Sequence, residues 1–152
     1  MRPDPVDLDD VVELVARGLR ANGTVVPDTR GVHPVQVTGD GQQLARAVAN
    51  LLDNAVRHAR SVVTVTLSQA PDGRATLAVL DDGPGIPADR REVVFERFTR
   101  LDDARSASDG GAGLGLAIAR EIAERHHGTL ELDVGHAPGS RFVLTLPTSR
   151  VR

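Results

Sequence analysis

The chain has 152 residues, enough for one domain with its own hydrophobic core, and its 40% apolar and 26% charged residues exclude global disorder. A net charge of −3 and an aromatic content of 2% argue against a nucleic-acid partner, because basic surface and stacking rings are both scarce. The absence of cysteine excludes disulfides, and no apolar run approaches the ~20 residues that span a bilayer. We expect a cytoplasmic domain without direct membrane contact, which is compatible with its being a piece of a membrane-anchored protein.

The N-terminal part of the chain predicts a helix followed by an irregular segment. Apolar residues at helical spacing predict a helix over residues 7–21, and Asp7 is placed to cap it. Prolines and a glycine interrupt residues 25–38, where only the alternation of Val35 and Val37 indicates a short strand.

A second helix is predicted over residues 40–59, because Asp40 and Gln43 have the spacing of a capping box. A hairpin, a short helix, a longer helix and a second hairpin follow. These elements are predicted over residues 62–67 and 75–80, 89–96, 114–126, and 129–134 and 141–146.

This order predicts an α+β fold in one domain covering residues 1–152. We expect a two-layer α/β sandwich, in which about three helices cover one face of a mixed, mostly antiparallel sheet of about five strands. Residues 101–112 are polar and rich in Asp, Ser, Ala and Gly, which is typical of a mobile loop.

The second helix carries an unusual polar face. Asn50, Asn54, Arg57 and His58 share one side of it, and two asparagines one turn apart are unfavourable in a helix interior. One interpretation is an ordinary solvated face. The other is a metal site, because an amide oxygen suits Mg²⁺, which takes few protein ligands and completes its shell with water and phosphate oxygens.

The segment 81–86 follows an apolar strand with Asp81 at the strand end. A carboxylate there can accept a hydrogen bond from an exocyclic amine such as that of adenine. Gly83 and Gly85 permit a sharp turn and the close approach of a flat base. A polar turn without a ligand is the alternative.

Residues 110–116 are rich in glycine and lead directly into a helix. Such a start exposes N–H groups, and the helix dipole favours a phosphate there. Upstream, Phe95 and Phe98 are spaced as two core anchors, and Arg97 and Arg100 beside them can reach a triphosphate.

Together these segments resemble the N, G1, F and G2 boxes of the histidine-kinase branch of the GHKL ATPases, the Bergerat-fold superfamily of gyrase, Hsp90, histidine kinases and MutL. The boxes correspond to residues 50–55, 81–86, 95–98 and 111–116. The resemblance covers nearly the whole chain, and it implies ATP and Mg²⁺ as cofactors with residues 99–112 as the ATP lid.

The resemblance also implies roles for individual residues. Asn54 would be the metal ligand and Asp81 would read adenine, whereas His58 would either stack on adenine or be an ordinary histidine at a helix end. Catalytic roles fall to Asn50, Asn54, Arg57 and Arg97. Nucleotide contacts fall to Asn54, Arg57, His58, Asp81, Gly83, Gly85, Ile86, Arg97, Arg100, Gly111, Gly113, Leu114, Gly115 and Leu116.

The implied activity is transfer of the γ-phosphate of ATP to a histidine, as in two-component signalling. None of the five histidines lies in the His-Glu/Asp-x-Arg pattern of the family's phosphoacceptor domain. We therefore expect that dimerisation and phosphoacceptor domain to be absent from this chain and to be its partner, with a response regulator downstream.

Two alternatives are a stand-alone serine kinase acting as an anti-sigma factor, and a degenerate ATP-binding regulatory module. The hydrolysing members and the anti-sigma kinases resemble each other in placing a glutamate base where this chain has Asn50. An amide cannot act as that base, so Asn50 favours transfer to histidine. The intact boxes argue against a degenerate module.

Overall fold

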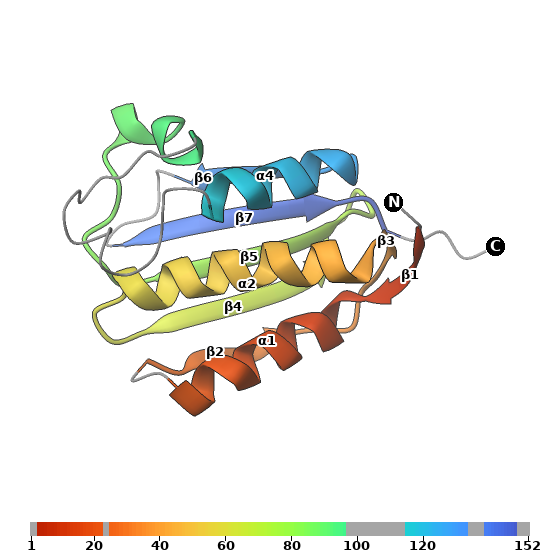
Figure 1. Cartoon of the computed structure of the whole chain (residues 1–152), viewed down its shortest axis with the longest axis horizontal. Coiled ribbons are helices and arrows are strands. Elements are labelled where there is room, and N and C mark those ends of the chain that lie inside the picture. Colours follow the sequence, from red (N-terminus) through yellow and green to blue (C-terminus); the bar gives the residue numbers. More distant parts are fainter. Residues whose placement is uncertain (1–2, 23–24, 97–114, 134–138, 149–152) are drawn as a thin grey trace.

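The helices lie on one face of a five-stranded sheet, which gives two layers (Figure 1). The computed structural model describes residues 3–22, 25–96, 115–133 and 139–148. The described helices are α1 (Leu8–Asn22), α2 (Gly41–His58) and α4 (Gly115–Arg125), with the 3₁₀ turns η1 (Ala88–Arg90) and η2 (Val93–Phe95). The strands are β1 (Asp4–Asp7), β2 (Pro27–Val32), β3 (Gln36–Gly39), β4 (Val63–Gln69), β5 (Ala75–Asp81), β6 (Thr129–Asp133) and β7 (Ser140–Leu146).

The main sheet has the strand order β2-β4-β5-β7-β6. Strand β2 runs parallel to β4, whereas all other neighbours in this sheet are antiparallel. The predicted fold class is therefore confirmed, including the mixed character of the sheet. No helix in the described part of the chain is long and apolar enough to cross a membrane.

Helix α2 forms because its start is capped and its apolar residues share one face. The N–H of Gln43 donates to the side chain of Asp40 at 3.0 Å, as the capping box requires. The return bond differs from the prediction, because the Asp40 N–H donates to Nε2 of the buried His126 at 3.1 Å. The Oε1 of Gln43 is buried without a hydrogen-bond partner among the described residues.

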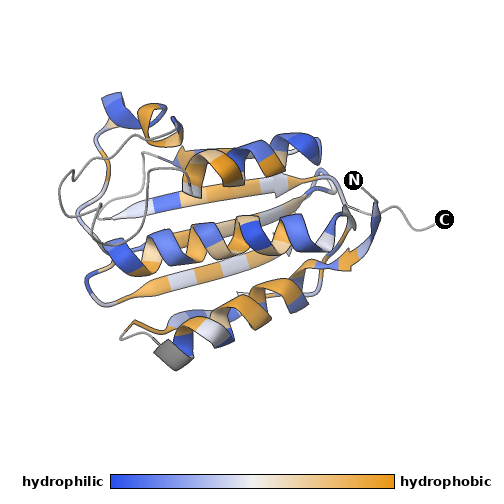
Figure 2. Cartoon of the chain, in the orientation of Figure 1, coloured by the Kyte–Doolittle hydropathy of each residue, from blue (hydrophilic) through white to orange (hydrophobic). Residues whose placement is uncertain are grey.

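The core lies between the two layers and is mainly aliphatic, as the composition predicts. Hydrophobic stripes alternate with hydrophilic ones along the helices (Figure 2). The largest buried side chains of the core include one aromatic, Phe142. Its ring packs edge-to-face against that of Phe95, with 5.9 Å between the ring centroids. The stripe that α2 contributes consists of Leu44, Ala47, Val48, Leu51, Leu52 and Ala55.

Two strands in the N-terminal part were not predicted. Strand β1 precedes α1 and pairs with β3, and α1 begins at Leu8, directly after the predicted cap Asp7. Strand β2 lies in the segment that its prolines and glycine marked as irregular. It tolerates Pro27 as the first residue of an edge strand, and Gly31 lies so close to Thr66 that a Cβ there would be 2.9 Å from its Cγ2.

The prediction of one helix over 89–96 is wrong, because the structure has two single 3₁₀ turns there, η1 and η2. The predicted hairpin of β4 and β5 and the helix that became α4 are confirmed with small changes of boundary. The mobile loop predicted over 101–112 and the lid over 99–112 lie outside the described residues.

Helix α4 ends in a left-handed residue that is not glycine. The N–H of Gly128 donates to the carbonyl oxygen of Ala123, and the N–H of His127 donates to the carbonyl oxygen of Glu124. These two bonds are the hydrogen-bond pattern of a Schellman motif. The φ of His127 is 63°, a conformation in which a Cβ is unfavourable.

We expect His127→Gly to stabilise the domain by about 0.5–1 kcal/mol, because the relief of this strain exceeds the added entropy of the unfolded chain. The melting temperature should rise by about 2 °C in calorimetry. Glycine at the neighbouring exposed helical position, Glu124→Gly, should lower it instead. A lower melting temperature for His127→Gly would mean that the imidazole stabilises the motif.

Candidate functional site

The polar face of α2 meets the first residue of α4. The side-chain amide of Asn50 donates to the carbonyl oxygen of Gly115 at 3.1 Å. Gly115 carries no Cβ, and one built there would lie 3.9 Å from Cβ of Asn50. The structure thus brings together the predicted helix face and the start of the helix that follows the glycine-rich segment, where N–H groups without intrahelical partners favour an anion.

Asn54 lies one turn after Asn50 and is half-buried. Its side-chain amide has no hydrogen-bond partner among the residues that the structure describes. The neutral amide oxygen fits Mg²⁺, which is satisfied by one or two protein ligands when phosphate oxygens supply the rest.

The two residues that complete this polar face have local partners. Arg57 forms an ion pair with Asp53 at 3.1 Å, one turn earlier on α2. The ring Nδ1 of His58 lies 2.8 Å from the carbonyl oxygen of Asn54, and it must carry the proton because that oxygen only accepts. Arg57 would have to leave Asp53 to contact a phosphate, and the stacking of His58 stays a prediction.

Asp81 is the last residue of β5 and is buried, with 5% of its surface exposed. Its Oδ1 accepts the N–H of Gly83 at 2.9 Å. Burial raises the pKa of Asp81 above its usual range, and the N–H groups of Gly83 and Ser140 oppose that rise. A buried carboxylate with spare acceptor capacity is suited to bind an exocyclic amine.

The two glycines after Asp81 are required by close packing. A Cβ on Gly83 would overlap the carbonyl oxygen of His58 at the end of α2. Gly85 has a φ of +81°, and a Cβ on it would lie 3.0 Å from the carbonyl oxygen of Gly139. Ile86 is half-buried against the core.

Phe95, the first residue of the predicted F box, contacts α4 through Arg120. The guanidinium of Arg120 lies 4.3 Å from the centroid of the Phe95 ring and pairs with Glu92 at 3.0 Å. Sequence reasoning missed Arg120, because no local pattern distinguishes it from other polar residues of a helix. Leu116, also on α4, is half-buried against the core.

Several predicted site residues lie outside the described residues. Among the described ones, the structure brings Asn50 together with Gly115, and it brings Asp81 and Gly83 together with the end of α2. The residues that it leaves undescribed are Arg97, Arg100, Gly111, Gly113 and Leu114.

Comparison with known proteins gives the family. Residues 39–150 match the family described as histidine kinase-, DNA gyrase B- and HSP90-like ATPases. The chain belongs to this family. The match includes α2, the turn after β5 and α4, so the matched domain contains every element of the candidate site.

The similar proteins place this ATPase domain among sensor histidine kinases. It is 40% identical over 98% of its length to the histidine-protein kinase/phosphatase MprB of Mycolicibacterium smegmatis, and 45% identical over 71% of its length to the sensor protein RstB of Escherichia coli. These alignments cover 31% and 25% of the two relatives, so the chain spans about a third of their length or less.

Solved structures agree with that placement. The mycobacterial sensor histidine kinase MprB superimposes with a TM-score of 0.84 at 36% identity, covering 98% of this chain and 99% of that one. The ATP-binding domain of PrrB from Mycobacterium tuberculosis does so with a TM-score of 0.78 at 29% identity, covering 97% and 98%.

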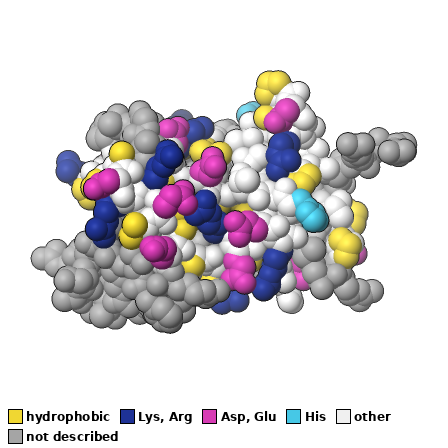
Figure 3. Space-filling model, turned by 90° about the horizontal axis from the view of Figure 1, so that it is seen from above, with side chains coloured by type: hydrophobic (Ala, Val, Ile, Leu, Met, Phe, Trp, Pro, Cys, Tyr) yellow, Lys and Arg dark blue, Asp and Glu magenta, His cyan; other side chains and the backbone are white. Residues whose placement is uncertain are grey.

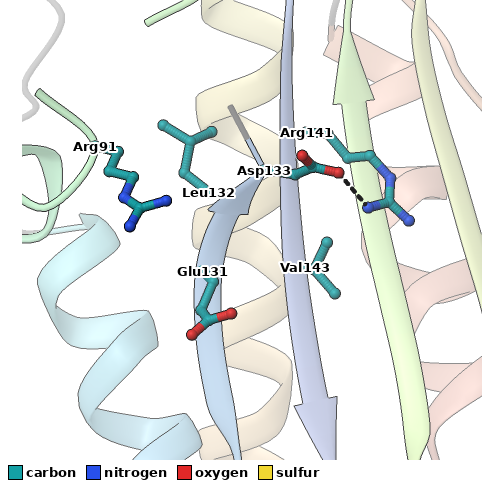
Figure 4. Close-up of a pocket in the computed structure, with 6 residues that line it drawn as sticks. All are labelled: Arg91, Glu131, Leu132, Asp133, Arg141 and Val143. Atoms are coloured by element: carbon teal, nitrogen blue, oxygen red, sulfur yellow. Dashed lines mark hydrogen bonds and ion pairs between the residues drawn. The ribbon is translucent and has the colours of Figure 1, made fainter. Parts of the chain in front are cut away.

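A cleft of about 340 Å³ lies elsewhere on the ATPase domain, beside β6 and β7 (Figure 4). Its charged lining residues include the ion pair of Arg141 with Asp133 at 2.9 Å, together with Arg91 and Glu131. Two arginines and two acids give no net attraction for a triphosphate, and none of the predicted site residues lines it. Basic and acidic side chains are also interspersed among the described residues on the face in Figure 3.

Proposed function

We propose that this domain binds Mg-ATP and donates the γ-phosphate to a histidine on a separate dimerisation and phosphoacceptor domain. The parent protein would be a membrane-anchored sensor kinase with this domain on the cytoplasmic side, and a response regulator would receive the phosphate next. The single observation that carries the proposal is the meeting of α2 with α4, joined by the bond from Asn50 to Gly115.

The nucleotide would lie along the C-terminal half of α2. The adenine amine would donate to Asp81, next to the glycine turn that packs on His58. The phosphates would lie between Asn54 and the N-terminal end of α4, whose N–H groups and dipole favour negative charge. Ile86 and Leu116 would form apolar contacts near the base.

The residues of the chain would prepare the phosphate for in-line attack. Asn54 would hold Mg²⁺, and the metal would supply positive charge beside the phosphates. Arg57 would exchange Asp53 for a phosphate oxygen, and Arg97 and Arg100 would add positive charge. The imidazole nitrogen of the acceptor histidine would form the new N–P bond, while the bond to the β–γ bridging oxygen breaks and ADP leaves with the electron pair.

The chemistry of Asn50 supports histidine as the acceptor over serine. A serine hydroxyl needs a base to remove its proton, and Asn50 is an amide whose N–H₂ is already used by Gly115. A neutral imidazole is nucleophilic without such help. An active site without a base at this position can therefore transfer phosphate to histidine.

The test is phosphotransfer from radiolabelled ATP. With Mg²⁺ and a separately prepared phosphoacceptor domain from a similar sensor kinase, label should appear on that domain and should be lost in acid but retained in base. Chelation of Mg²⁺ should abolish it, and the acceptor domain with its histidine changed to glutamine is the control.

The other outcomes separate the remaining functions. Acid-stable label on a protein serine would support a serine kinase, and binding of an ATP analogue in calorimetry without any transfer would support a regulatory module. Equal affinity of the unmutated domain for ATP and GTP would contradict the role given to Asp81.

A further inference from the structure

The carboxylate of Asp82 joins two loops that meet beside the proposed nucleotide site. Its Oδ1 accepts N–H groups from Arg60 at 2.8 Å, Ser61 at 3.0 Å and Val62 at 3.0 Å. Its Oδ2 accepts the Ser61 hydroxyl at 2.9 Å and the Ser61 N–H at 3.2 Å. The main-chain N–H of Asp82 also donates to the Val62 carbonyl oxygen at 3.2 Å.

Three successive main-chain N–H groups that converge on one oxygen form an anion-binding nest. This nest takes up residues 60–62 of the connection between α2, which ends at His58, and β4, which begins at Val63. Hydrogen bonds from Ser61 and Val62 hold the pKa of Asp82 well below its usual range, so the carboxylate is ionised at neutral pH.

The turn that follows β5 has few other hydrogen bonds among the described residues. Residues 82–87 belong to no helix or strand, and Pro84 and Pro87 are exposed. Besides the contacts of Asp82, the turn is held by the Gly83 N–H on Asp81 at 2.9 Å and by packing contacts of Gly83 with His58, Gly85 with Gly139 and Ile86 with the core. Asp82 therefore supplies most of the hydrogen bonds between this turn and the α2–β4 connection.

We infer that Asp82 is a positioning residue, which fixes the turn carrying Asp81 and Gly83 to the end of the helix that carries Asn54. The inference rests on the proposed function and deepens it. Asp82 does not touch the nucleotide; it sets the distance between the group that reads the base and the group that holds the metal. Adenine selectivity then depends on a carboxylate outside the pocket.

The test uses Asp82→Asn, because alanine would remove every side-chain acceptor of the nest and disturb folding. Asparagine keeps one acceptor oxygen but loses the charge and the second acceptor. The matched control is Asp72→Asn, since Asp72 accepts the Arg74 N–H at 2.9 Å in the β4–β5 turn at the other end of the sheet.

Two readouts distinguish positioning from general stability. In the nucleotide-free domain, amide hydrogen exchange of Gly83 should rise at least about tenfold in Asp82→Asn and stay unchanged in Asp72→Asn. The preference for ATP over GTP should fall at least about fivefold in Asp82→Asn alone, while the affinity for inorganic tripolyphosphate stays within about twofold. Asp82→Asn should melt at a lower temperature than Asp72→Asn, because folding lowers the pKa of Asp82 and its ionised carboxylate therefore stabilises the fold. Both readouts are taken at a temperature at which each variant is fully folded.

Unchanged exchange of Gly83, or an unchanged preference for ATP in Asp82→Asn, would overturn the positioning role and leave the proposed function intact. An equal loss of affinity for ATP, GTP and tripolyphosphate would overturn it too, because it would indicate general loosening of the fold. Failure of the unmutated domain to bind ATP would instead overturn the proposed function, and the positioning role with it.

Discussion

Asn54→Ala should lower the rate of phosphotransfer by about 100-fold or more, because it removes the proposed protein ligand of Mg²⁺. The side chain is half-buried on α2 and bonds to nothing else among the described residues, so its loss should change stability little. The measurement is a titration of nucleotide affinity against Mg²⁺, in which the Mg²⁺-dependent part of the affinity should disappear.

The control for this variant is Arg46→Ala, at an exposed position on the same helix. Its affinity and transfer rate should equal those of the unmutated domain. If Asn54→Ala retained the full dependence on Mg²⁺, the metal assignment would be wrong. Asn50→Ala should behave differently, because its amide links α2 to Gly115, and it should weaken nucleotide binding with and without the metal.

The elements that the sequence predicts well are those whose local signals agree with their packing. Helix α2 has a cap at Asp40 and an unbroken apolar stripe, and the two hairpins have alternating strands joined by turn residues. In such segments the local preference and the buried face give the same answer, so tertiary contacts change only the boundaries.

The missed elements depend on partners that are distant in the chain. Strand β2 contains Pro27 and Gly31 and is a strand only because β4 lies beside it, and β1 requires β3 about thirty residues later. The capping box at Asp40 illustrates the same limit. Gln43 has the right spacing, but His126 at the end of α4 is the residue that receives the Asp40 N–H.

The candidate site was predictable as residue types and order, but not as contacts. Spacing indicated Asn50 and Asn54 on one helix face, yet the bond from Asn50 to Gly115 spans 65 residues. The role of Asp82 had no separate signal, because in the sequence it is the second of two adjacent aspartates. Only the fold distinguishes Asp81, buried at the end of β5, from Asp82, whose carboxylate lies in the nest.

Gly83→Ala should have a large effect on both stability and nucleotide affinity. A Cβ at this position overlaps the carbonyl oxygen of His58, which is main chain and cannot rotate away. The turn must move, which we expect to cost about 2 kcal/mol of stability and to lower affinity for ATP more than about tenfold. Denaturant unfolding and calorimetry measure the two effects.

Gly18→Ala is the matched control, because Gly18 lies in the interior of α1 and a Cβ there meets no atom within 4 Å. That variant should be about 0.5–1 kcal/mol more stable, since alanine favours a helix, and should bind ATP normally.

The affinity of Gly83→Ala for tripolyphosphate decides how far the damage extends. Retained affinity would mean that Asn54 and the start of α4 still form a phosphate site while the base site is lost. A Gly83→Ala variant with normal stability and normal ATP affinity would show that the turn and α2 are not in contact, and that adenine binds elsewhere.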